Sequence, residues 1–297
     1  MKKLILITLL ILTGFQIFSQ TDTTKKVCIV QNDGSKFIGK IIQEDSREVT
    51  IRLDGGRTIA IPQYVISTIT TVNLDDYTVD GKYVGKDNFQ TRYFLTTNGL
   101  PLERGKNYVQ WSLFGPDIQF SITDHLGAGV MTSWFGIPII GTIKYSWSIN
   151  PKVHVAVGGL VGTGSWAAPG VGGALPFTSL TFGTGRSNIT FSGGWGAFFD
   201  LGDVEGRGIV SVAAMSKVGK KVSLVFDSFI MLPGKTQTYT TPYYTYQKQR
   251  QGISIFTPGI RIHGTETAAF QFGFTIVVVE GELIKVPIPM VQWYRSF

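Results

Sequence analysis

The sequence predicts an all-β protein: a transmembrane antiparallel β-barrel of about twelve strands, preceded by a small periplasmic β module of SH3-like or Sm-like type. The composition is the first observation behind this fold, with 16% charged residues, 12% aromatic residues and 36 glycines among 297 residues. Few charges and many aromatics exclude a disordered chain. Beyond the first twenty residues, no apolar run approaches the roughly 18 residues of a membrane helix. Apolar and polar residues instead alternate in short stretches, as they do in strands.

The first 19 residues predict a secretory signal peptide. Basic Met1–Lys3 precedes the apolar stretch Leu4–Phe18, and polar residues follow. This stretch is too short and wrongly flanked for a membrane helix. We expect cleavage after Ser19 and therefore an exported protein.

Residues 26–73 predict the small periplasmic module. The turn signals Asn32-Asp33-Gly34 and Asp54-Gly55-Gly56 lie between short apolar runs, which predicts hairpins. Cys28 is the one cysteine of the sequence and lies in such a run, so we expect a buried strand residue. The polar residues 74–91 are expected to form a linker.

Residues 92–297 predict the barrel. Alternating short and long gaps between apolar runs distinguish periplasmic turns from outer loops. Strand 92–97 is included because a chain that enters and leaves the barrel at the periplasmic side needs an even number of strands. Ten strands are the alternative. The twelve expected strands are residues 92–97, 108–123, 127–134, 139–149, 153–161, 177–183, 189–199, 209–218, 222–232, 253–262, 268–279 and 286–297.

The alternation distinguishes a barrel from a soluble sandwich only when the aromatic content is considered. Phe270, Phe272 and Phe274 alternate with Gln271 and Thr275, a period of two that either fold would show. Large aromatics on the apolar face of an exported protein favour the barrel.

The chain ends in a strand that closes on an aromatic residue. Trp293 and Phe297 share one face of that strand and resemble the insertion signal that the barrel-assembly machinery reads in outer-membrane barrels. We therefore expect that machinery and outer-membrane lipid as partners, in a Gram-negative bacterium.

Three further segments point to a known group of proteins. Leu102–Tyr108, Phe120–Leu126 and the Ile288-Pro289 ending resemble an uncharacterised family of outer-membrane β-barrels from Bacteroidota. The resemblance covers most of residues 93–297. It implies a location and a fold, and it supplies no catalytic residues.

The sequence argues against an enzyme. A barrel lipid hydrolase needs a Ser-His pair near the outer face, whereas His125, His154 and His263 all lie near predicted periplasmic turns. Three histidines and one cysteine form no recognisable metal site. We therefore expect no catalytic residues, no metal and no cofactor, and keep an outer-membrane lipid hydrolase only as a third hypothesis.

Several polar residues fall on the faces of strands that should point into the lumen, since a charge facing lipid costs about 2–4 kcal/mol at the membrane midplane. They predict a narrow passage or binding cavity with a slight preference for anions. In the alternative interpretation, which we weight more, Asp227 pairs with one of the cations and closes the lumen. The lumen-lining candidates are Gln110, Lys144, Lys217, Asp227, Arg261 and Gln271.

The longest outer loop, residues 233–252, combines tyrosines with basic residues and no acid. It predicts contact with acidic glycans or lipid headgroups, a partial plug over the barrel mouth, or an interfacial girdle without a ligand. No nucleic-acid partner is expected. The contact candidates are Tyr239, Tyr243, Tyr244, Tyr246, Lys248 and Arg250.

These features predict a non-enzymatic outer-membrane barrel, and the leading hypothesis is a narrow channel or carrier for small solutes. The alternative is a non-conducting structural or accessory subunit that anchors the periplasmic module to an envelope complex. Residues 26–73 would then contact a periplasmic protein or peptidoglycan.

Overall fold

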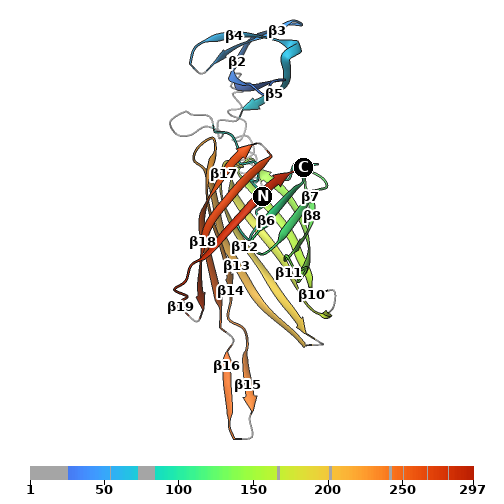
Figure 1. Cartoon of the computed structure of the whole chain (residues 1–297), viewed down its shortest axis with the longest axis vertical. Coiled ribbons are helices and arrows are strands. Elements are labelled where there is room, and N and C mark those ends of the chain that lie inside the picture. Colours follow the sequence, from blue (N-terminus) through green and yellow to red (C-terminus); the bar gives the residue numbers. More distant parts are fainter. Residues whose placement is uncertain are drawn as a thin grey trace, which may run out of the picture. The chain divides into compact units, whose positions relative to one another are not determined.

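The chain divides into two compact units, one within residues 1–74 and the other within residues 75–297 (Figure 1). The predicted signal peptide lies outside the described residues. In the part of the chain that the structure describes, no helix is long and apolar enough to cross a membrane. The computed structural model describes residues 26–53, 55–72, 84–165, 168–200, 203–240, 243–249, 251–265, 267–279 and 281–297.

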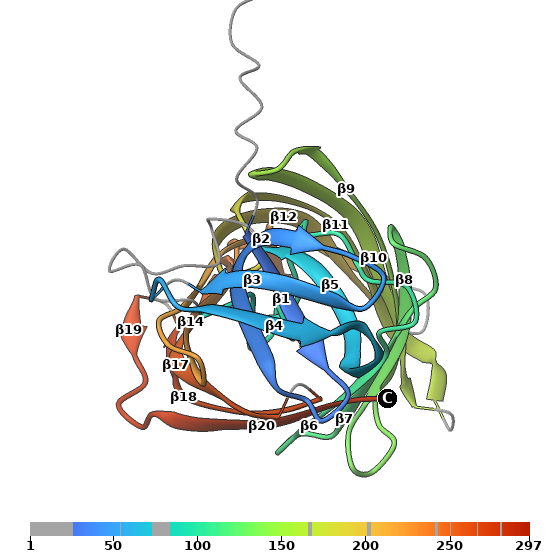
Figure 2. The same cartoon turned by 90° about the horizontal axis from the view of Figure 1, so that it is seen from above.

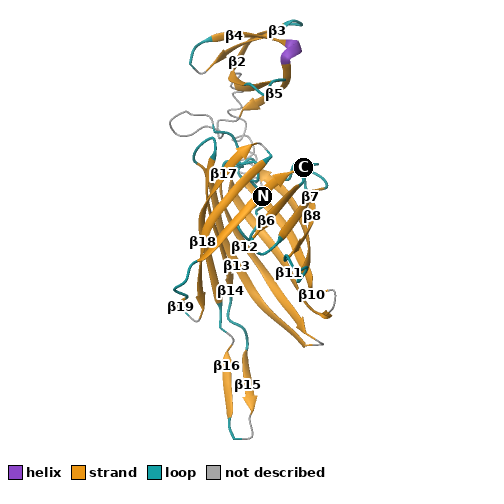
Figure 3. Cartoon of the chain, in the orientation of Figure 1, coloured by secondary structure: helices purple, strands orange, loops and turns teal. Residues whose placement is uncertain are grey.

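The first unit is a five-stranded antiparallel sheet in the order β4-β3-β2-β1-β5. Figure 3 shows its single helical turn, η1 (Gln63–Val65), which precedes the last strand. Cys28 is 8% exposed, so the prediction of a buried strand residue is confirmed. The core of this N-terminal unit consists of Val27, Ile29, Val49, Ile51 and Ile61. The strands are β1 (Lys26–Gln31), β2 (Lys36–Glu44), β3 (Glu48–Leu53), β4 (Thr58–Pro62) and β5 (Ile66–Val72).

The second unit is a closed antiparallel barrel, which confirms the predicted β-barrel, whereas the SH3-like type of the N-terminal module stays a prediction. Twelve of the described strands form its wall, and Figure 2 shows them around the barrel axis. Pairing of β20 with β6 and of β17 with β18 closes the ring. The wall strands are β6 (Tyr108–Ser112), β7 (Pro116–Ser121), β8 (Leu126–Thr132), β9 (Ile139–Asn150), β10 (Val153–Ser165), β11 (Ala168–Gly183), β12 (Ser187–Asp200), β13 (Asp203–Lys217), β14 (Val222–Met231), β17 (Ile253–Thr265), β18 (Ala268–Val279) and β20 (Ile288–Ser296).

The number of wall strands matches the prediction, but the prediction contained two errors that cancel. Residues 108–123 were expected as one strand, whereas a tight turn divides them into β6 and β7. Ser112 makes this turn because its Oγ accepts hydrogen bonds from the N–H groups of Phe114 and Gly115. Residues 92–97, expected as the first strand, do not belong to the wall and contribute only an isolated bridge between Arg92 and Thr97.

The barrel wall is uneven in height. Strands β10 to β13 contain 13, 16, 14 and 15 residues, whereas β6, β7 and β8 contain 5, 6 and 7. A membrane strand needs about 9–11 residues, so three neighbouring strands fall short of that length. Residues 168–173 were expected within a Gly- and Pro-rich loop, but Ala168, Gly172 and Gly173 pair with β10 and Val171 pairs with β12, so β11 is longer than predicted.

The two faces of the wall differ in chemistry. Outward side chains around the ring are large, apolar and 37–55% exposed, for example Ile143, Phe191, Trp195, Phe226 and Phe274. Inward side chains in the half near the short turns are polar and buried, as described below. A soluble barrel would show the opposite arrangement, with the apolar face inside.

The turn between β6 and β7 provides a test of the revised strand assignment. Gly115 has φ +145°, and a Cβ there would lie 2.0 Å from the carbonyl oxygen of Thr132 on β8. Gly136 also has a positive φ, +72°, but a Cβ there meets nothing within 4 Å. We expect Gly115→Ala to lower the free energy of unfolding by more than about 2 kcal/mol, and Gly136→Ala by only about 1 kcal/mol of backbone strain. Urea unfolding in lipid vesicles measures both; equal losses would contradict this turn.

Candidate functional site

The barrel lumen is occupied by the chain's own residues 84–107, called here the lumen segment. Residues 84–91 were expected in the linker and residues 92–97 in the wall. The segment instead hydrogen-bonds to inward side chains on strands from opposite sides of the ring, so it lies inside the barrel. Its contacts include Asp117 on β7, Lys144 on β9, Thr181 on β11, Thr190 on β12, Lys217 on β13, Asp227 on β14, Arg261 on β17, Gln271 on β18 and Gln292 on β20.

Arg261 is the centre of this network. Its guanidinium has no exposed surface. Nη1 lies 2.9 Å from Oδ1 of Asp87 and donates to the carbonyl of Phe89 at 2.9 Å, while Nη2 donates to the carbonyl of Arg92 at 2.6 Å. One side chain of the wall therefore holds three successive parts of the lumen segment.

Asp87 is the anionic partner of Arg261 and is also fully buried. Burial alone would raise the pKa of this carboxyl. The charge of Arg261 and hydrogen bonds from His263 and Ser223 outweigh burial and hold the pKa well below its usual range. The carboxylate thus stays ionised, and the attraction that secures the base of the segment persists at any physiological pH.

A row of polar side chains on β18 and β20 secures the next residues. Gln292 donates to the carbonyl of Phe94 at 2.8 Å. The hydroxyl of Tyr294 donates to the carbonyl of Tyr93 at 3.0 Å. These bonds satisfy backbone carbonyls that would otherwise be buried without partners, which is costly in a closed lumen.

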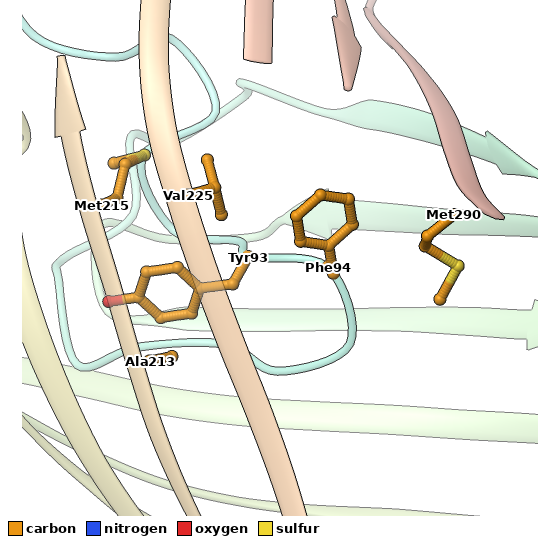
Figure 4. Close-up of a cluster of buried hydrophobic side chains, with 6 residues drawn as sticks. All are labelled: Tyr93, Phe94, Ala213, Met215, Val225 and Met290. Carbon is orange, nitrogen blue, oxygen red and sulfur yellow. The ribbon is translucent and has the colours of Figure 1, made fainter. Parts of the chain in front are cut away.

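Phe94 inserts its ring against the wall at a pair of glycines. Gly259 on β17 pairs with Gly273 on β18, and a Cβ on either would lie 2.5 and 2.7 Å from Cζ of Phe94. In Figure 4 the ring of Phe94 lies between Val225 and Met290. Only residues without a side chain leave room for a ring at this place.

The neighbouring Tyr93 extends toward the opposite side of the lumen, toward Ala213 (Figure 4). Its hydroxyl hydrogen-bonds to the side chains of Asn188 and Thr190 on β12. Burial raises the pKa of this hydroxyl to about 12, so it stays protonated and able to donate. Tyr93 and Phe94 thus contact different parts of the wall, β12 in one case and β17 and β18 in the other, three and four places further along the ring.

Asp227 holds the tip of the segment, and the prediction that it pairs with a lysine or arginine is wrong. Its carboxylate accepts hydrogen bonds from the N–H groups of Leu95 and Thr96, at 2.6 and 2.8 Å, and from Thr96 Oγ1 at 2.6 Å. Backbone donors thus neutralise the charge where a cation was expected. An inserted loop thus lies beside Asp227 in the lumen, in place of the expected ion pair.

The other lumen candidates also lie on the inward face. Lys217 donates to the carbonyl of Lys86 at 2.8 Å, and Gln271 accepts from Nε of Arg261 at 2.6 Å. Gln110 is 4% exposed on β6. Lys144 donates to Thr97 Oγ1 at 3.1 Å and to the carbonyl of Asn98 at 3.2 Å. All six candidates therefore surround the lumen segment or border it.

A cavity of about 150 Å³ lies beside the tip of the segment. Lys144 is the cation on its β9 side, and hydroxyl groups and apolar side chains from β10 to β14 form the rest of its lining. The polar lining includes Thr96, Thr142, Ser192 and Ser211, and the apolar lining includes Leu160, Leu175, Phe177 and Phe229.

Ser223, His263 and Asp87 form a cluster that superficially matches a hydrolase. Nε2 of His263 lies 3.1 Å from Oγ of Ser223 and 3.0 Å from the carboxylate of Asp87. A catalytic triad uses the two ring nitrogens for different partners, whereas one nitrogen faces both partners here. Ser223 also donates its proton to Asp87 at 2.7 Å, so this buried cluster secures the lumen segment. Among the described residues no group of histidines, cysteines and carboxylates could hold a metal ion.

The long outer loop contains a separate hairpin, β15 (Thr236–Thr240) and β16 (Thr245–Gln249). Tyr243, Tyr244 and Tyr246 are 92%, 63% and 43% exposed. The hairpin extends away from the barrel (Figure 1), so the prediction of a partial plug over the mouth is wrong. Tyr239 and Lys248 lie on its two strands, and Arg250 falls outside the described residues.

At the chain end, Trp293 and Phe297 are 46% and 63% exposed. The ring of Phe297 packs edge-on against Phe120 at 6.2 Å, and that of Trp293 lies 5.5 Å from Phe270. Both aromatics therefore lie on the outer surface of the barrel, and their role as an insertion signal stays a prediction.

No model of a known protein family matches the chain, and no curated protein matches its sequence. The solved structures to which the chain is similar include two that share 10% identity with it. One is the NanC porin, with a TM-score of 0.42 over 65% of this chain and 98% of that chain. The other is a loop-deletion mutant of OmpT, an outer-membrane protein of Vibrio cholerae, with a TM-score of 0.39 over 92% and 97%. The barrel assignment depends on the chain's own strand pairing.

The Arg261–Asp87 pair provides a test of the network. Asp87→Asn removes the counter-charge and leaves a fully buried guanidinium, which costs about 3–5 kcal/mol. We expect Asp87→Asn to lower the free energy of unfolding by this amount, whereas Lys221→Met in an exposed turn changes it little. Urea titration of both variants in lipid vesicles measures the difference. A loss below about 1 kcal/mol for Asp87→Asn would show that the pair does not secure the segment.

Proposed function

We propose that this protein is an integral outer-membrane β-barrel whose lumen segment closes it, so that the resting barrel anchors the N-terminal module without conducting. The observation that carries the proposal is the buried Asp87–Arg261 network, which fastens residues 84–107 across the lumen. The same segment follows the N-terminal module in the chain, with residues 73–83 between them. The proposal includes membership of the Bacteroidota barrel family that the sequence resembles.

The outer surface of the wall supports the membrane location. Large apolar residues are exposed around the ring while charged residues face inward. Exposing so many aromatics to water would be unfavourable, and monomeric soluble proteins rarely present such continuous apolar patches. In a bilayer the same surface contacts lipid, and buried polar groups inside the wall satisfy one another.

The N-terminal module is proposed to lie in the periplasm as a small SH3-like domain. A four-stranded meander followed by a helical turn and a fifth strand paired with β1 supports this interpretation. Its proposed partners are a periplasmic protein or peptidoglycan, and the barrel-assembly machinery would read Trp293 and Phe297 during insertion.

A narrow channel or carrier for small solutes is the second candidate. The cavity beside Lys144 favours it, because the lumen is not filled beyond the tip of the segment. Conduction would require residues 92–97 to leave their position. The wild-type protein and a variant without the loop tip therefore distinguish the two roles.

We expect the purified wild-type barrel to be silent in a planar bilayer. A variant in which Gly-Gly replaces residues 93–96 should show discrete, ohmic openings, because Arg92 and Thr97 are already paired and the shorter loop can close between them. The variant lacks Tyr93 and Phe94, the two rings that lie in the lumen between β12 and the β17–β18 pair.

The control is the conservative variant Tyr93→Phe, which retains the ring and should stay silent. Both variants must first show the folded, heat-modifiable band on an SDS gel. Ohmic conductance by the wild type would overturn the closed-barrel proposal in favour of the channel. A folded loop variant that stays silent would show that the segment is not the barrier.

A further inference from the structure

Lys144 is a lysine inside the barrel whose amino group has no anionic partner among the described residues. No carboxylate of the described residues lies within 4 Å of its ammonium; Asp117 pairs with Arg92, and Asp227 accepts from the backbone of the segment tip. The ammonium donates to two neutral oxygens, those of Thr97 and Asn98. An ammonium has three donors, so one remains for another acceptor. Lys144 lines the cavity, where an anion would complete its surroundings.

A second polar group in the same cavity also lacks a partner. Oγ of Ser211 on β13 is buried and has no hydrogen-bond partner, and the residue is 5% exposed. A buried hydroxyl without a partner is uncommon, because each unsatisfied group costs about 1–3 kcal/mol. Ser211 lines the cavity from β13, and Lys144 lines it from β9. Two incompletely bonded polar groups on different strands indicate a ligand site.

The size and the remaining lining restrict what could bind. The side chains of Leu160, Leu175, Phe177 and Phe229 contribute apolar surface. A protein cavity of about 150 Å³ accommodates a benzene-sized molecule. We propose that the cavity binds a small amphiphile with one carboxylate and an apolar body of benzene size. Its carboxylate accepts a hydrogen bond from Lys144, and its apolar body packs against the four side chains.

Strands β6, β7 and β8 are short. On this side a ligand could enter the cavity without passing the lumen segment. The turns above β6–β8 carry Leu113, Phe114, Trp134 and Phe135, which are 50–89% exposed. Trp134 stacks on Trp111 and donates to the carbonyls of Ser112 and Leu113, which fixes this apolar rim. Met131, near the end of β8, lines the cavity. Given the proposed membrane location, this rim lies at hydrocarbon depth, so a longer chain could extend from the cavity into the bilayer.

The test is equilibrium dialysis of radiolabelled benzoate against the full-length barrel in nanodiscs, with empty nanodiscs as the reference. We expect saturable binding of one benzoate per barrel. Lys144→Met should weaken it at least tenfold, and Lys221→Met should leave it unchanged. Benzyl alcohol, which has the same shape without the charge, should compete at least tenfold more weakly with the wild type.

A second variant keeps the proposal testable if Lys144→Met does not fold. Leu160→Trp fills the cavity and retains the cation, so it should abolish benzoate binding in a folded barrel. Equal binding by wild type and Lys144→Met, full binding by folded Leu160→Trp, or no saturable binding by the wild type would each overturn the site. Benzoate binding and conductance are separate measurements. A barrel that binds no benzoate would leave the closed-barrel proposal standing, and a barrel that conducts could still be tested for benzoate binding.

Competition by longer carboxylates identifies the source of the ligand. If dodecanoate displaces benzoate at least as well as hexanoate does, the chain leaves through the rim and the ligand comes from the bilayer. If only hexanoate competes, the ligand is a water-soluble carboxylate. Either result supports the carboxylate site and assigns its source.

Discussion

The guanidinium of Arg261 lies in the lumen without exposed surface, and most of the interior is arranged around it. A buried charge is tolerated only when its counter-charge and hydrogen-bond partners are present. The wall supplies Gln271, the sulfur of Met215 and the ring of Tyr294 but no carboxylate. The carboxylate of Asp87 and the carbonyls of Phe89 and Arg92 come from outside the wall. Because the wall carries this buried charge, the lumen segment must insert to provide its counter-charge and its carbonyl hydrogen-bond acceptors.

The second constraint is steric. The lumen of a twelve-stranded barrel is wider than side chains from the wall alone can fill, and two aromatic residues of one loop span it. Phe94 needs the paired Gly259 and Gly273, and Tyr93 needs hydroxyl and amide partners on β12. Glycine on an inward face thus has a packing role here.

Much of this architecture could be predicted from residue patterns. Period-two alternation identified the faces of the strands, so all six lumen candidates were placed correctly on the inward side. Their partners were not predicted, because hydrogen bonds such as that between Asp227 and Leu95 join residues more than a hundred positions apart. The buried Val84 and Phe89 were a signal within the supposed linker: apolar residues in a polar connection indicate a segment with a surface to pack against.

The sequence by itself determined an all-β chain, the alternation of inward and outward faces along the strands and the separate N-terminal sheet, because these depend on local periodicity and turn residues. Tertiary structure alone decided that residues 92–97 enter the lumen rather than the wall, and that residues 108–121 form a hairpin rather than one strand. A six-residue run with three consecutive large apolar residues, Tyr93 to Leu95, satisfies a strand and an inserted loop equally well. The choice depends on whether distant side chains, above all Arg261 and Asp227, supply the hydrogen bonds that a neighbouring strand would otherwise provide.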